Sequence, residues 1–438
     1  MPPSVVLLLP KKSYRADDFF RAAQRLQVEV VVASDRCHQL AELWPSAGEA
    51  GSKLVLTQTL PLPFREPAAA AAELFRQVSE RRPRAIVGVD DETAVIAALA
   101  SEALGLPHNP IAAVAAARNK ARSRTLLREA GVPVPWFEVL PAGSRGAALE
   151  AAAARFLYPC VVKPLVLSAS RGVIRADDPA SLCAAFQRVA ALLRLPEVAE
   201  KREPDLDKIL IEGYLPGPEV ALEGLLTAGK LRVLAIFDKP DPLEGPFFEE
   251  TLYVTPSRLP EADQAAIAAM SARAATALGL REGPIHAELR LTAEGPRVLE
   301  VAARSIGGLC GRTLRFGAGL SLEEVILGHA LGRAPESSRE TKAAGVLMLP
   351  IPRRGVLKGV SGVEAAKAVP GIEDVVVTAR LDEELVPLPE GASYLGFAFA
   401  RAGTPAEVEA ALRQAHARLR FEIAPSLAIA ALNLSAGD

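Results

Sequence analysis

Cysteine, methionine and tryptophan are scarce in this chain, with 4, 3 and 2 of them among 438 residues. The cysteines lie far apart, so their spacing predicts neither a zinc site nor a framework of disulfide bonds. Sparse, unpaired cysteines are typical of the reducing cytosol, and we expect a cytoplasmic protein. The four residues are Cys37, Cys160, Cys183 and Cys310.

Long apolar runs and a net charge are also missing. The run Val5 to Leu9 has no basic segment before it, and no stretch approaches the roughly 20 apolar residues of a membrane span. The 50 basic and 52 acidic residues leave a formal charge of −2, without the excess positive charge that binds phosphate backbones. Neither a membrane nor a nucleic acid is therefore an expected partner.

The first 110 residues alternate short β-branched runs with helical patterns. Strands separated by helices of this length predict a doubly wound parallel sheet, whose ligand edge would include Asp90 and Asp91. The fingerprint G-x-G-x-x-G is absent after the first strand, where "LPKKSYR" stands, so a Rossmann-type oxidoreductase is disfavoured. Strands are expected at 4–10, 28–34, 53–57 and 85–91, and helices at 17–26, 67–81 and 93–104.

The rest of the chain predicts a mixed α and β organisation. A single helix is expected over 112–131, closed by Gly131, and a second unit then opens with the strand "CVVKP". Three strand-like runs follow between 209 and 240, and a helix at 261–279 leads into a hairpin. From about 343, three strands and two helices predict a small α+β domain.

The hairpin segment "HAELRLTAEGPRVLEVAARS", residues 286–305, places one glutamate on each strand among apolar neighbours. Counting by twos, His286, Glu288 and Arg290 share one face of the first strand. A three-residue turn with Gly295 in the left-handed conformation would set Glu288 opposite Glu300. Because facing carboxylates destabilise a strand pair, the arrangement predicts a cation between them.

Three further segments are compatible with a bound polyphosphate. Lys163 ends the strand "CVVKP", and the small residues Ser168, Ser170 and Gly172 follow it in a loop whose N–H groups could cover phosphate oxygens. Lys120 lies in "ARNKARS", and "ILIEGYL" ends a strand in an acidic residue. Taken singly, each has an ordinary alternative: a strand-end charge reaching solvent, a solvated helix face, or a strand followed by a turn.

The order of these features resembles the ATP-grasp superfamily, within it the amino-acid ligase and biotin-carboxylase-like branch. That order is a helix lysine, a strand lysine with a Ser/Gly loop, an acidic hinge, and paired glutamates before "EVAARS". The resemblance implies α/β and α+β domains. They are a pre-ATP-grasp Rossmann-like domain over 1–112, a linker helix and lid subdomain over 113–208, a catalytic subdomain over 209–335, and a small α+β domain over 343–438.

Carried onto matching positions, the resemblance implies a site for ATP and Mg²⁺, or Mn²⁺ in its place. Arg304 would face the acceptor carboxylate and the transferring phosphoryl group, with Lys239 as a second catalytic residue, and Glu288 and Glu300 would hold the metal. Residues implied on the nucleotide side are Lys120, Lys163, Ser168, Ser170, Arg171, Gly172, Val173, Glu212, Gly213, Tyr214, Leu215 and Glu219. Those implied on the substrate side are Glu250, His286, Gly307 and Gly308.

Within these assignments, Glu212 and Leu215 are expected to border the adenine through main-chain groups, and Glu219 to accept from the ribose hydroxyls. Lys239 and Glu250 could instead be ordinary loop charges, and His286 a structural residue. Two departures from the family pattern stand out. Ala302 replaces an asparagine that supplies an oxygen to a second magnesium, and the phosphate loop has Leu167 and Ala169 where smaller or polar residues are usual.

The resemblance implies a carboxylate-amine ligase. A carboxylate attacks the γ-phosphate of ATP to give an acyl phosphate, and an amine then displaces phosphate to form an amide, so the partners are a small carboxylate and a small amine. Two alternatives stay open: a bicarbonate-activating carboxylase of the biotin or purine-biosynthesis type, and a nucleotide-binding protein without turnover. The resemblance is also in keeping with a homodimer through the first domain.

Overall fold

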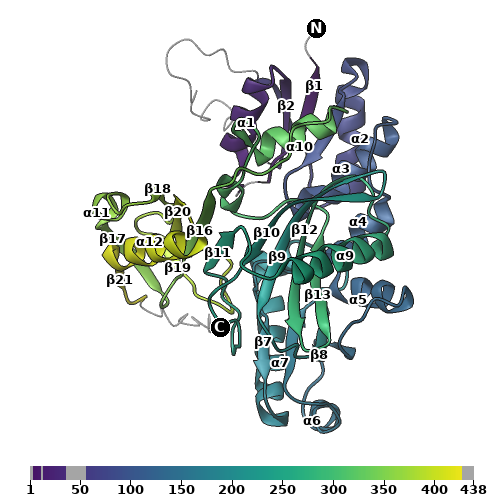
Figure 1. Ribbon diagram of the computed structural model, residues 1–438. Coiled ribbons are helices and arrows are strands. Elements are labelled where there is room, and N and C mark those ends of the chain that lie inside the picture. Colours follow the sequence, from purple (N-terminus) through teal and green to yellow (C-terminus); the bar gives the residue numbers. More distant parts are fainter. Residues whose placement is uncertain (1–2, 11–12, 36–55, 427–438) are drawn as a thin grey trace, which may run out of the picture.

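The computed structural model describes residues 3–10, 13–35 and 56–426. Figure 1 shows the N-terminal sheet with α2 and α3 at the top, α6 and α7 at the bottom, and the C-terminal helices α11 and α12 at the left. A long antiparallel sheet connects these regions. Within the described ranges no helix is both long and apolar enough to cross a membrane.

The N-terminal sheet has the strand order β3-β2-β1-β4, and all of its strand pairs are parallel. Val5 and Leu7 of β1 pack with Phe19 of α1, whereas Val6 and Leu8 pack with α2 and α3 on the opposite face. The doubly wound parallel sheet is therefore confirmed. Its elements are β1 (Ser4–Leu8), α1 (Ala16–Arg25), β2 (Glu29–Ser34), β3 (Leu56–Pro61), α2 (Pro67–Val78), η2 (Ser79–Arg81), β4 (Ala85–Gly88) and α3 (Asp91–Ala103).

The strand predicted at 53–57 begins outside the described residues. The description resumes at residue 56, where β3 begins. Cys37 also lies outside them. The structure describes three cysteines with free thiols, which are Cys160, Cys183 and Cys310.

The single helix predicted over 112–131 is wrong, because the structure has two helices, α4 (Ile111–Arg118) and α5 (Lys120–Glu129). They break at Asn119, whose backbone is extended and whose side-chain oxygen accepts from the N–H groups of Ala121 and Arg122, both at 3.1 Å. Asparagine favours such an N-cap because its side chain satisfies N–H groups that the first helical turn leaves open. Gly131 follows α5 with a positive φ of 69°, as predicted.

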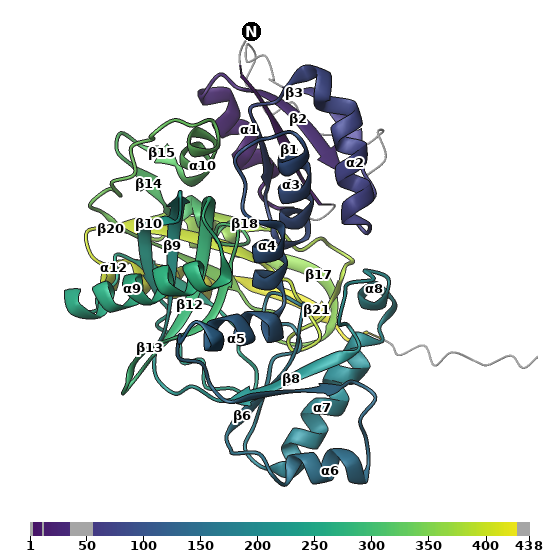
Figure 2. The same ribbon diagram turned by 90° about the vertical axis from the view of Figure 1, so that its right-hand side faces the viewer.

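The lid region is a four-stranded antiparallel sheet of order β5-β8-β6-β7, covered by α6 and α7. Figure 2 shows these two helices below β6 and β8. Its elements are β5 (Phe137–Pro141), α6 (Ala147–Ala153), β6 (Cys160–Pro164), β7 (Ile174–Ala176), α7 (Pro179–Leu193), α8 (Pro196–Ala199) and β8 (Lys208–Gly213).

The large sheet has eight strands in the order β13-β12-β9-β10-β11-β16-β20-β18. Side chains of β9 alternate between its two faces: Leu222 packs toward α9, and Leu225 packs toward the core that contains α10 and the N-terminal sheet. The elements of this part of the chain, up to residue 330, are β9 (Glu219–Thr227), β10 (Lys230–Asp238), β11 (Leu252–Thr255), α9 (Glu261–Leu278), β12 (Gly283–Thr292), β13 (Gly295–Ala302), η3 (Cys310–Thr313), β14 (Arg315–Phe316), β15 (Leu320–Ser321) and α10 (Leu322–Ala330).

The C-terminal segment has the expected α and β content, but it is not a separate sheet. β16 pairs with β11, so three of its strands extend the large sheet, and β17, β19 and β21 form a small sheet beside it. The elements are β16 (Ala343–Leu349), β17 (Gly355–Ser361), α11 (Val363–Lys367), β18 (Ile372–Val377), β19 (Glu384–Leu385), β20 (Gly396–Ala402), α12 (Pro405–Arg418) and β21 (Arg420–Ala424).

Candidate active site

A cavity of about 360 Å³ opens among the N-terminal sheet, the lid, the large sheet and the C-terminal segment. Most of the residues predicted for the site line it, which brings together positions up to 188 residues apart in the sequence, from Lys120 to Gly308. Of the predicted set, Lys239, Arg171 and Gly172 do not line the cavity. Those that do are Lys120, Lys163, Ser168, Ser170, Val173, Glu212, Gly213, Tyr214, Leu215, Glu219, Glu250, His286, Glu288, Glu300, Arg304, Gly307 and Gly308.

The predicted faces of the hairpin and the pairing of its two glutamates are confirmed, although the turn that joins the strands differs from the predicted one. Thr292 pairs with Gly295, so the turn between them has two residues, and the predicted three-residue turn is wrong. A bulge at Leu299 adds one residue to β13, and this restores Glu288 opposite Glu300. Gly295 does have a positive φ, of 98°. The bulge therefore places Glu288 and Glu300 at facing positions of β12 and β13.

The strand lysine Lys163 is buried, with 6% of its surface exposed, so the alternative of a charge reaching solvent is wrong. Its ammonium pairs with Glu212, which also accepts from Arg124 at 2.8 Å and 3.1 Å. Burial lowers the pKa of Lys163 to about 8. Burial would raise the pKa of Glu212, but the charges of Arg124 and Lys163 outweigh it and lower that pKa to about 2.

Lys120 begins α5 directly after the break at Asn119, and it does not lie on a solvated helix face. Its side chain is 11% exposed, its ammonium donates to the Leu167 carbonyl at 2.8 Å, and it lies 3.4 Å from Glu300. The backbone N–H of Lys120 donates to Leu165 at 3.0 Å. The helix break therefore holds Lys120 between the phosphate loop and the second glutamate of the hairpin.

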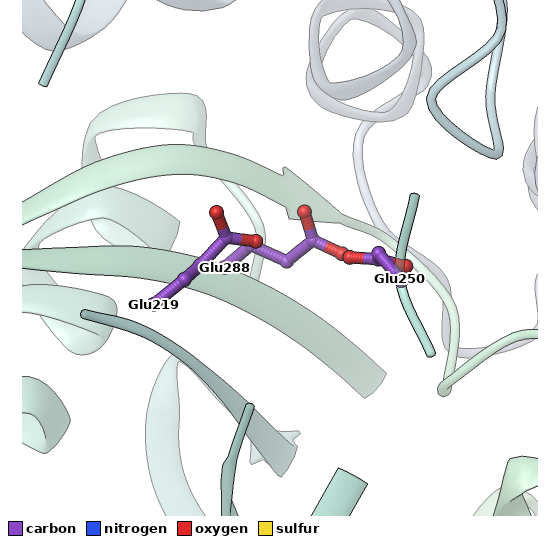
Figure 3. Close-up of side chains that lie close together, drawn as sticks. All are labelled: Glu219, Glu250 and Glu288. Carbon is purple, nitrogen blue, oxygen red and sulfur yellow. The ribbon is translucent and has the colours of Figure 1, made fainter. Parts of the chain in front are cut away.

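The carboxylates nearest to one another are Glu219, Glu250 and Glu288, and each offers an oxygen within 4.8 Å of the others. Figure 3 shows the three side chains converging from β9, the segment before β11, and β12. Lys239 donates to Glu219 at 2.6 Å and to Glu250, and its nitrogen lies 3.6 Å from Glu288. Lys239 therefore lies in a carboxylate cluster, and the alternative of ordinary loop charges for Lys239 and Glu250 is wrong.

His286 adds a second positive charge at this cluster. Its Nε2 lies 3.4 Å from Glu288 and its Nδ1 lies 3.2 Å from Glu223, which is fully buried. Burial disfavours the imidazolium, but hydrogen bonds with the two carboxylates raise the pKa of His286 to about 9. Burial likewise disfavours the Glu288 carboxylate, yet the charge of Lys239 and the hydrogen bond with His286 lower its pKa. The protein thus supplies its own cations beside this glutamate.

Glu250 holds a proton more readily than an exposed glutamate does. Burial, followed by the charge of Glu288, raises its pKa to about 7. A group of three carboxylates is the hard oxygen donor set that Mg²⁺ and Mn²⁺ take, so these residues fit a divalent cation. Among the described residues the group that fits is Glu219, Glu250 and Glu288, whereas the predicted partner Glu300 is held by Lys120.

Arg304 projects from the end of β13 toward the N-terminal sheet. Its Nε donates to Asp91 at 2.8 Å, and its Nη1 donates to the Ser305 carbonyl at 3.0 Å. Burial would raise the pKa of Asp91, but the Arg304 charge outweighs it and lowers that pKa. Asp91 lies just after β4, at the ligand edge predicted for the parallel sheet. The arginine therefore spans the junction between the first sheet and the large sheet.

The phosphate loop departs from the prediction at two residues. Gly172 donates its N–H to the Pro389 carbonyl at 2.8 Å, and Arg171 donates to the Glu390 carbonyl at 2.7 Å. Both residues therefore anchor the loop to the C-terminal segment, while Ser168 and Ser170 face the cavity. Ala169 and Ser170 have positive φ angles of 56° and 52°, a left-handed conformation that residues with a Cβ rarely adopt.

Three family models match the chain in sequence order. Residues 20–108 match the ATP-grasp N-terminal domain, residues 156–313 the ATP-grasp domain, and residues 347–424 the L-amino acid ligase C-terminal domain 2. The chain belongs to the ATP-grasp superfamily. The segment matched at 347–424 contains strands that extend the large sheet and the small sheet beside it.

A solved structure similar to this ATP-grasp chain is an L-amino acid ligase from Bacillus licheniformis. It is 27% identical, with a TM-score of 0.77 over 96% of this chain and 98% of that one. A phosphoribosylglycinamide synthetase from Anaerococcus prevotii has a TM-score of 0.67 at 13% identity over 97% of this chain and 100% of that one, which shows the fold alone.

The curated relatives match over part of their length. Carnosine synthase 1 from Gallus gallus is 30% identical over 360 residues, or 74% of this chain and 37% of that protein. Protein y4rH from Sinorhizobium fredii, which has no assigned function, is 27% identical over 308 residues, or 70% of this chain and 61% of that protein. The ATP-grasp chain therefore spans less than two thirds of these relatives.

Several cavity residues of this ATP-grasp chain were not predicted from the sequence. Arg15 is buried and donates to the Val89 carbonyl and to Ser305, at 3.1 Å and 2.8 Å. Arg290 was placed on the correct strand face, but not in its contact with Glu219 at 3.1 Å. Neither arginine lies in a local pattern that marks a site, and the face shared with Glu288 was the one signal available for Arg290.

Proposed function

We propose that this protein is an ATP-dependent carboxylate-amine ligase that joins amino acids through an acyl phosphate. The observation that carries the proposal is one cavity that is lined by two lysines, a carboxylate cluster and Arg304. The similarity to an L-amino acid ligase over nearly the whole chain supports amino acids as substrates.

In this proposal the lysines and the loop bind the nucleotide. Lys120 and Lys163 meet phosphate oxygens, and the loop at 168–173 covers them with N–H groups. Glu288, with Glu219 and Glu300 beside it, would hold Mg²⁺, which when bound neutralises the polyphosphate and aligns it for attack. The ammonium of Lys239 keeps the carboxylates together without a metal, since three close negative charges repel one another.

The transfer step depends on position and charge. Arg304 is held by Asp91, so its planar fork is oriented before a substrate arrives. It binds the carboxylate that attacks the γ-phosphate and stabilises the charge that develops on the transferring group. An amine then attacks the carbonyl carbon of the acyl phosphate, the bond to phosphate breaks, and the nitrogen releases a proton as the amide forms.

The test is a coupled assay of ADP release by the purified chain with MgATP. Pairs of amino acids form the main arm, and bicarbonate and single small carboxylic acids form separate arms. ADP release that requires two amino acids, with a dipeptide of matching mass as product, is the expected result. ADP release with bicarbonate alone would instead indicate a carboxylase, and ATP binding without turnover in every arm would indicate a binding protein.

A further inference from the structure

The cavity has an aromatic and apolar end that the phosphoryl-transfer chemistry does not use. Three separated parts of the chain build it: the segment before α1, the loop after β13, and the C-terminal strands β16 and β20. Its side chains are uncharged at neutral pH. They belong to Tyr14, Ile306, Cys310, Met348, Tyr394 and Phe397.

Phe397 is the centre of this end. Its ring lies 6.0 Å from that of Tyr14 in an edge-on arrangement and 6.2 Å from that of Tyr394. Met348 is its direct partner across β16 and β20. A Cβ on Gly308 would come within 3.0 Å of the Phe397 ring, so the loop that follows Arg304 rests on this ring. The aromatic end and the Arg304 loop are therefore packed as one wall.

Tyr14 closes the opposite side, and its position is fixed through its neighbour. Arg15 donates to the Val89 carbonyl at 3.1 Å, to Ser305 at 2.8 Å and to Glu323 at 3.2 Å. These bonds tie the segment to the end of β4 and to the Arg304 loop. The Tyr14 ring is thereby held against Phe397, although the residue remains 42% exposed.

Two charged residues line the same cavity as this aromatic end. Arg304 and Glu250 both line the cavity, and burial, followed by the charge of Glu250, raises the pKa of Tyr394 and that of Cys310. An amino acid presents a carboxylate and an ammonium on one carbon, with its side chain on a third bond. An amino acid whose charged groups bind Arg304 and Glu250 has Tyr14, Met348 and Phe397 in the same cavity for its side chain.

We propose that the amino acid held by Arg304 and Glu250 has an apolar, aromatic or thioether side chain, which this aromatic end binds. The inference rests on the proposed ligase function and adds its side-chain specificity. A charged side chain would lose part of its hydration among these uncharged side chains, whereas leucine, methionine or phenylalanine would gain apolar and sulfur-aromatic contacts.

The test uses the full chain with MgATP, with alanine as the constant second amino acid, and measures kcat/KM for ADP release. Leucine, methionine or phenylalanine is expected to exceed aspartate and lysine by at least about tenfold, the range in which apolar pockets discriminate. Equal or better use of aspartate or lysine overturns the inference but leaves the ligase function standing. If no amino acid supports ADP release with any partner, the proposed function fails and this inference fails with it.

A variant tests whether the aromatic end is the cause. Tyr14→Lys adds a cation at an exposed position, so it should not prevent folding. It is expected to shift the ratio of kcat/KM for aspartate over leucine upward by about tenfold while KM for ATP stays constant. Phe75→Lys is the matched control, since Phe75 is 38% exposed on α2 and does not line the cavity. An unchanged ratio in folded Tyr14→Lys would overturn the inference.

Discussion

At the scale of single residues, Glu212 lies in a buried triad with Arg124 and Lys163, and we expect the free energy of unfolding to depend on its charge. Arg124 is 1% exposed and Glu212 is 3% exposed, so Glu212→Gln leaves two buried cations without a counter-charge. Removing one partner of a buried ion pair costs roughly 3–5 kcal/mol, and we expect that loss in the free energy of unfolding measured with urea.

Glu138→Gln is the control, because Glu138 pairs with Arg155 on the surface of the lid and exposed ion pairs contribute little to stability. The pH dependence has a defined sign. The pKa of Glu212 is lowered to about 2, so its stabilisation is present above its unfolded-state pKa and is lost as pH falls through that window toward 2. The Gln variant should lose this acid dependence. Equal losses in the two variants would contradict the prediction.

Arg304 is the second residue for which we make a prediction, because a substitution by lysine keeps its charge and changes its geometry. Arg304→Lys keeps the positive charge but loses the planar fork that donates to Asp91 and the Ser305 carbonyl. The proposed role predicts a fall in kcat for ADP release of roughly 10²–10³-fold, the effect of removing one charge-stabilising donor. Arg297→Lys, on β13 and paired with exposed Glu294, should leave kcat unchanged. An Arg304→Lys enzyme with normal kcat would rule out the assignment.

At the scale of elements, the break between α4 and α5 positions a lysine that a continuous helix would turn elsewhere. Asn119 caps α5 and donates to Asp205 at 2.8 Å. Asn119→Ala should lower the free energy of unfolding by about 1–2 kcal/mol and raise KM for ATP, since Lys120 loses its anchored start. Asn119→Ser retains a capping oxygen and should recover most of both. Recovery of neither, or no loss in the alanine variant, would contradict this role of the cap.

At the scale of the whole molecule, the shared sheet makes the C-terminal segment part of the main fold. Without residues 343–438, β11 would lose its partner β16 and the core would lose Met348 and Phe397. A chain of residues 1–342 should therefore aggregate, as expected for an exposed strand edge beside an open core. Coexpression with 343–438 should yield a copurifying pair. A monomeric 1–342 fragment with cooperative unfolding would show that the two parts fold independently.

The secondary structure and much of the site could be predicted because they depend on local patterns. The alternation in β12 identified the apolar face that packs on α9 and the polar face that carries Glu288. The pairing of Glu288 with Glu300 was correct although the turn was not, because the bulge at Leu299 compensates for the missing turn residue. Local patterns could not reveal the bulge, since it depends on how β13 packs.

The amino-acid sequence by itself determined which segments become strands and helices, which strand faces are buried, and which side chains carry charge. Only the tertiary structure decided the partners of those charges. Lys239 sits among Glu219, Glu250 and Glu288, and Lys120 holds Glu300. Periodicity acts over a few residues, whereas an ion pair in a buried cavity depends on chain segments that meet only after the sheets have packed.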